Sequence, residues 1–147
     1  MGYYMRFIST DEQEITLSLL KSALKLVDPQ YSIANVHKIP REFGDLMHGN
    51  DIYGQIEINR LGDSLFEEEL EELKELLGES KGKESVLQIL TNAKTSVVIQ
   101  VLWQERDSEQ TLSKIDPLWN WLFTNRQGLL QADGEGYYDS SGLIAEE

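Results

Sequence analysis

The only two histidines of the chain, His37 and His48, share one polar stretch with the acids Asp45 and Asp51. Imidazole and carboxylate groups are common ligands of Zn²⁺ and common general acids and bases. The segment from His37 to Asp51 therefore suggests a metal-dependent hydrolase as one candidate function. Because the His-Glu-x-x-His spacing of zinc hydrolases is absent, we favour an ordinary polar loop here.

Three carboxylates also lie close together near the C-terminus, at Asp133, Glu135 and Asp139. Carboxylate oxygens bind Ca²⁺ and Mg²⁺, so the Asp133 to Asp139 segment is the second place where a metal-dependent hydrolase site would be sought. Its spacing does not match an EF-hand loop, and Asp-Gly between two apolar runs is typical of a hairpin turn. We therefore expect no bound metal and no cofactor.

Aromatic residues near this turn suggest a binding surface instead. On the helix expected after Pro117, Trp121 points away from the apolar stripe, and two tyrosines follow the turn. Exposed aromatic side chains are typical anchors of protein interfaces. We predict one surface patch for a protein partner, or for a homodimer, made of Trp121, Tyr137 and Tyr138 and rimmed by Asp133, Glu135 and Asp139. The alternatives are that the tyrosines pack in the core, or that an aromatic pocket between sheet and C-terminal helix binds a small molecule as a sensor.

Glutamates crowd the segment between Ser64 and Gly78, where Lys74 is the single basic residue. Like charges three or four positions apart destabilise a helix, so local helix energetics do not favour this cluster. A solvated helix face would explain it, and a docking surface for a basic partner is the functional alternative. The residues assigned to that surface are Glu68, Glu71, Glu72 and Glu75.

Composition narrows the function classes. The chain has 147 residues, 26 acids against 13 bases and a formal net charge of −13. Such a field repels nucleic acid and anionic membrane surfaces, so neither is an expected partner. The absence of cysteine excludes disulfides and thiolate metal sites. We expect a soluble, cytoplasmic, bacterial-type binding module without enzymatic activity. It would dock a basic protein partner as immunity or adaptor proteins do, an analogy from charge and size alone.

The hydrophobic pattern predicts an α+β fold. Strands are expected at Tyr3–Ile8, Tyr31–Val36, Ile52–Asn59 and Thr95–Trp103, with residues 37–51 as a loop. With intervening helices this order is the split βαβ pattern, which predicts a ferredoxin-like core with a mainly antiparallel sheet. Thr95–Trp103 is apolar on both faces and should lie in the centre of the sheet.

Capping signals predict the helix boundaries. Ser9 and Ser64 each open a capping box, and Gly78 fits the end of the second helix. The buried stripe expected on that second helix is Phe66, Leu70, Leu73 and Leu77. A shorter helix follows at Ser85–Ala93, and Asp116-Pro117 predicts a break between two C-terminal helices. We expect one domain, with residues 1–104 as the core and residues 105–147 as a helical and hairpin extension.

Overall fold

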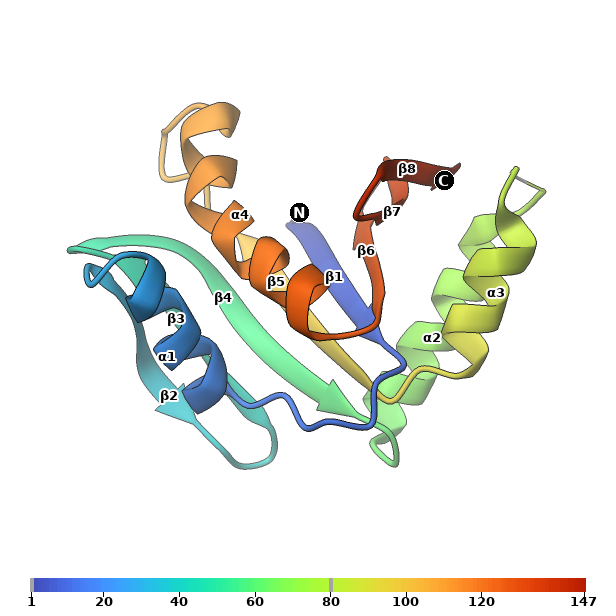
Figure 1. The fold of residues 1–147 in the computed structure, drawn as a ribbon, viewed down its shortest axis with the longest axis horizontal. Helices are drawn as coiled ribbons and strands as arrows, with labels where there is room; N and C mark the ends of the chain where they lie inside the picture. The colour runs from blue at the N-terminus through green and yellow to red at the C-terminus, as the bar shows by residue number, and fades with distance from the viewer. Residues whose placement is uncertain (1, 80) are drawn as a thin grey trace.

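One open antiparallel sheet organises residues 2–79 and 81–147, which are the residues that the computed structural model describes. Together with four helices, the sheet gives these residues an α+β fold (Figure 1). Each strand pairs antiparallel with its neighbours. In spatial order the eight strands are β2 (Tyr31–His37), β3 (Glu42–His48), β4 (Asp51–Arg60), β5 (Thr95–Val101), β1 (Tyr3–Ser9), β6 (Gly128–Ala132), β7 (Gly136–Asp139) and β8 (Gly142–Glu146).

The central position of β5 is confirmed. It pairs with β4 on one side and with β1 on the other. Val97 and Ile99 are fully buried, and Val98, on the opposite face of the sheet, is only 4% exposed. Burial of the middle of a strand on both faces requires consecutive apolar residues, which the sequence supplies at Val97, Val98 and Ile99.

The prediction of a loop over residues 37–51 is wrong, because this segment contains β3 and the β3–β4 turn. Gly44, although glycine is common in turns, faces the core within the strand. A side chain there would place Cβ 2.8 Å from Ile33 Cγ2, so glycine permits close packing of β2 against β3. The additional strand and the position of β5 between β4 and β1 leave the ferredoxin-like core unconfirmed.

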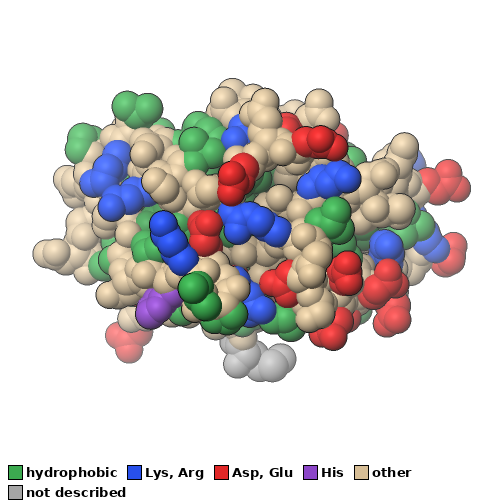
Figure 2. Space-filling model, turned by 90° about the horizontal axis from the view of Figure 1, so that it is seen from below, with side chains coloured by type: hydrophobic (Ala, Val, Ile, Leu, Met, Phe, Trp, Pro, Cys, Tyr) green, Lys and Arg blue, Asp and Glu red, His purple; other side chains and the backbone are tan. Residues whose placement is uncertain are grey.

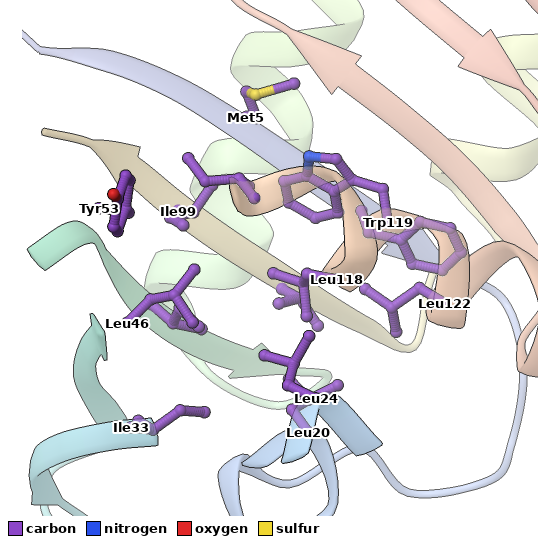
Figure 3. Close-up of a cluster of buried hydrophobic side chains, with 14 of the residues drawn as sticks. Met5, Leu20, Leu24, Ile33, Leu46, Tyr53, Ile99, Leu118, Trp119 and Leu122 are labelled. Atoms are coloured by element: carbon purple, nitrogen blue, oxygen red, sulfur yellow. The ribbon is translucent and has the colours of Figure 1, made fainter. Parts of the chain in front are cut away.

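Helices cover both faces of the sheet. On the first face lie α1 (Leu17–Val27) and α4 (Ser108–Asn125), and on the second lie α2 (Ser64–Leu77) and α3 (Lys83–Thr91) (Figure 1). The larger hydrophobic core fills the space beneath α1 and α4 (Figure 3). The smaller one joins the predicted α2 stripe of Phe66, Leu70, Leu73 and Leu77 to α3 and to the C-terminal strands.

The helix boundaries differ from the capping signals in three places. Thr16, not Ser9, caps α1 by accepting a hydrogen bond from the Leu19 N–H at 3.1 Å. Asp63 rather than Ser64 caps α2. Pro117 lies inside one continuous α4, where burial of residues on both sides of it offsets the lost backbone hydrogen bond.

The C-terminal residues are part of the same sheet. β6 pairs with β1 over five residues, and the predicted hairpin forms as β6 and β7. The last strand, β8, was not predicted. Its short run of mixed residues after Gly142 carries no clear alternation in the sequence.

Gly54→Ala tests the close packing of β4 against β5. A Cβ at this position would lie 2.6 Å from Ile99 Cδ1 and 2.9 Å from the Gln100 carbonyl oxygen. We expect the free energy of unfolding to fall by about 1–3 kcal/mol, as for other overpacked positions. Urea denaturation measures it, with Ser22→Ala on the exposed surface of α1 as the control. Equal stability of both variants and the parent would contradict the packing described.

Candidate functional site

Arg6 of β1 brings two acidic segments of the chain together. Its side chain is only 13% exposed and forms ion pairs with carboxylates from both segments. Arg6 Nε lies 2.9 Å from Glu69 Oε2 on α2, and Nη1 lies 2.7 Å from Asp133 Oδ1 after β6. The glutamate-rich helix and Asp133, where the C-terminal acidic turn begins, therefore lie on the same side of the sheet.

Further hydrogen bonds fix the orientation of this guanidinium. Arg6 Nη1 donates to Gln131 Oε1 at 2.7 Å, and the Gln131 amide donates to Asp133 at 3.2 Å and to Glu147 at 2.8 Å. Burial opposes the charge of Arg6, but Glu69 and Asp133 outweigh it and raise the pKa of Arg6 above its ordinary value. Arg6 is therefore held as a permanent cation between the two segments.

We define the acidic surface as the exposed glutamates of α2 together with the two carboxylates that form ion pairs with Arg6. Among the α2 glutamates predicted to bind a partner, only Glu71 forms an ion pair, with Lys74 at 3.3 Å. Acidic side chains crowd the end of the molecule that carries α2 and α3, at the right of Figure 2. The acidic surface comprises Glu67, Glu68, Glu69, Glu71, Glu72, Glu75 and Asp133.

The predicted aromatic patch does not form. Tyr137 is fully buried in the smaller core on the second face of the sheet. Trp121 packs against the larger core on the first face, where Arg126 stacks over its ring at 5.3 Å. Successive residues of a strand point to opposite faces, so Tyr137 and Tyr138 are separated by β7 itself. Burial raises the pKa of Tyr137 above its ordinary value.

The carboxylates of the C-terminal turn each have a different partner. Glu135 accepts hydrogen bonds from Tyr3 at 2.5 Å and from Tyr138 at 2.7 Å. The hydrogen bond to Glu135 raises the pKa of Tyr138. Asp139 accepts from the Ser141 hydroxyl at 2.6 Å, and this bond lowers the pKa of Asp139. The turn does not gather its carboxylates around one point.

The two histidines do not form a common site either. His37 is paired with Phe43 across the β2–β3 hairpin, and His48 is five residues further along β3, which corresponds to about 17 Å of strand. His48 Nε2 contacts Asp28 Oδ2 at 2.9 Å, and this hydrogen bond lowers the pKa of Asp28. Within residues 2–79 and 81–147, no group of three or more acidic or histidine side chains is placed to hold a metal ion.

The space predicted for an aromatic small-molecule pocket is filled. Trp119, at 3% exposure, and Leu118 occupy the interface between α4 and the sheet (Figure 3). A shallow hollow of about 280 Å³ lies instead on the second face, over β3, β4, β5 and β1. The sequence does not predict this hollow, because its pattern indicates a loop in place of β3. The residues whose side chains line it are Tyr4, Phe43, Gln55, Glu57, Val98 and Gln100.

Comparison with known proteins gives no match: no family model, no curated protein and no solved structure is similar to this chain. None of the helices in the described part of the chain is long and apolar enough to span a membrane. The site must therefore be interpreted from its own geometry.

Substitutions at Tyr137 distinguish core packing from a surface anchor. Its hydroxyl is buried without a hydrogen-bond partner among the described residues. We therefore expect Tyr137→Phe to leave the free energy of unfolding unchanged or to raise it by up to about 1 kcal/mol. Tyr137→Ala should lower it by about 3–5 kcal/mol. If Tyr137→Ala changed stability in urea denaturation by less than about 0.5 kcal/mol, the residue would behave as exposed.

Proposed function

We propose that this chain is a non-enzymatic binding module that docks a basic protein partner through the acidic surface. The observation that carries the proposal is the pair of ion pairs from Arg6 to Glu69 and Asp133. They join two acidic segments that are more than sixty positions apart in the sequence. A continuous surface of one charge steers an oppositely charged partner more effectively than separate charges do.

The ionic contacts of this surface leave an excess of negative charge. Arg6 is one cation shared by two carboxylates, and among the described residues the one ion pair of Lys74 is with Glu71. Glu68, Glu72 and Glu75 are exposed glutamates of the same helix. Their repulsion opposes helix formation, and a cationic partner would relieve it. Because a second copy would place like charges opposite each other, a foreign basic partner fits this surface better than a homodimer does.

Charge reversal on α2 tests the proposal. We expect the triple variant Glu68→Lys, Glu71→Lys, Glu72→Lys to lower the association rate with a cationic protein, such as lysozyme, by about tenfold or more at low salt. Surface plasmon resonance over a series of salt concentrations measures this rate. The difference from the parent should shrink as salt increases, because screening weakens steering.

The matched control reverses three exposed acids outside α2, with Glu12→Lys, Asp51→Lys and Glu105→Lys. It changes the net charge by the same amount, so it separates a local docking surface from the total charge. Equal rates for the two triple variants would remove α2 from the proposal.

A further inference from the structure

The second face of the sheet is only partly covered by helices. α2 and α3 pack over Ile8 of β1 and Leu129 of β6, but the hollow of about 280 Å³ lies beyond them, over the strands from β3 to β1. The strand register places two rows of side chains on this face, and all of them except Asp45 and Arg6, which lie at the ends of the rows, line the hollow. One row is Asp45, Gln55, Gln100 and Tyr4, and the other is Phe43, Glu57, Val98 and Arg6.

The hollow adjoins the acidic surface through Arg6. Arg6 and Tyr4 lie two positions apart on one strand, so their side chains share this face, and Arg6 Cζ lies 5.5 Å from the Tyr4 ring centroid. The ion pair of Arg6 with Glu69 then places α2 beside the same face. A partner held by the α2 glutamates would therefore have the hollow within reach.

Charge around the hollow favours a cation. Two guanidinium groups beside the hollow already pair with two carboxylates each: Arg6 with Glu69 and Asp133, and Arg41 with Glu57 and Asp63. Asp45 adds a further carboxylate, whose partners are the neutral amides of Asn35 and Gln55. Five carboxylates thus surround two guanidinium groups, so a cationic ligand would be attracted and an anion repelled.

Aromatic rings at the two ends of the floor favour a planar cation. Phe43 is 36% exposed and stacks on His37 with 4.5 Å between ring centroids, and Tyr4 lines the opposite side. A guanidinium stacks on aromatic rings and binds carboxylates through two parallel hydrogen bonds, whereas an ammonium is a hydrated point charge. The chain's own arginines stack in this way at Arg106 over Tyr53, at 4.0 Å, and at Arg126 over Trp121.

We propose that this hollow receives an arginine side chain from an exposed segment of the basic protein partner. The inference rests on the proposed function and names the chemistry of the partner residue. A volume of about 280 Å³, near the lower end of the range of about 300–1,000 Å³ typical of ligand pockets, is enough for one or two side chains of a macromolecule. The α2 glutamates attract the partner, and the hollow selects arginine over lysine.

Titration of the ¹⁵N-labelled 147-residue chain with N-acetylated tetra-arginine amide tests the inference, with the tetra-lysine peptide as the equally charged comparison. The side-chain amides of Gln55 and Gln100 report from the floor of the hollow. We expect their NMR signals to shift with the arginine peptide, and its Kd to be about threefold or more lower than that of the lysine peptide. Equal Kd values, or unshifted Gln55 and Gln100 signals, would overturn the inference.

Variants separate this inference from the proposed function. Phe43→Ala removes a ring, and Asp45→Asn removes a charge with little change of shape. Each should weaken arginine-peptide binding by about threefold, and Asp51→Asn should not.

If only the α2 triple reversal weakens binding, the acidic surface stands and the arginine site is contradicted. If only the two hollow variants weaken binding, the arginine site stands without α2. If no cationic peptide binds, both proposals fail.

Discussion

A single partly buried cation, Arg6, determines how the acidic half of this protein is arranged. A guanidinium at 13% exposure requires compensation for lost hydration, and Glu69, Asp133 and Gln131 supply it within 2.9 Å. Glu69 lies on α2, Gln131 on β6 and Asp133 directly after β6, so the contacts of one residue of β1 connect three elements of the fold. The position of α2 relative to Asp133 is set in this way, because a cation between two acidic segments offsets their mutual repulsion.

The helices cover the two faces of the sheet unequally, and the hollow lies on the part of the second face that they leave uncovered. α1 and α4 cover the first face with the larger core, whereas α2 and α3 cover only the part of the second face nearest the C-terminal strands. On the uncovered part, polar side chains of β3, β4 and β5 can contact water, so no apolar helix has to pack over them. Arg6 lies at the border between the covered and uncovered regions, because it contacts both Glu69 of α2 and the ring of Tyr4.

The sequence predicted those elements whose hydrophobic period is unbroken. The central strand β5, the buried stripe of α2 and the hairpin of β6 and β7 form as expected, because a local pattern determined each of them. β3 was missed because Gly44 resembles a turn residue and has a packing role that only its neighbours reveal. α4 continues through Pro117 because tertiary burial outweighs a local stop signal.

The candidate site was predictable only in its parts. The glutamates of α2 and the carboxylates near Asp133 were recognised separately, but nothing local indicates that Arg6 connects them across more than sixty residues. The aromatic patch failed because the alternation of β7 buries Tyr137 and because Trp121 belongs to the opposite face of the sheet. Which residues come together depends on the pairing of distant strands, and local patterns in one sequence do not specify that pairing.

A double-mutant cycle between Arg6 and Glu69 tests the central role of Arg6 most directly. Free energies of unfolding would be measured for the parent, Arg6→Met, Glu69→Gln and the double variant by urea denaturation. If Arg6 holds α2 to the sheet, the two substitutions should be non-additive by about 1 kcal/mol or more. Additivity within about 0.5 kcal/mol would show that the two side chains act independently and would contradict the account.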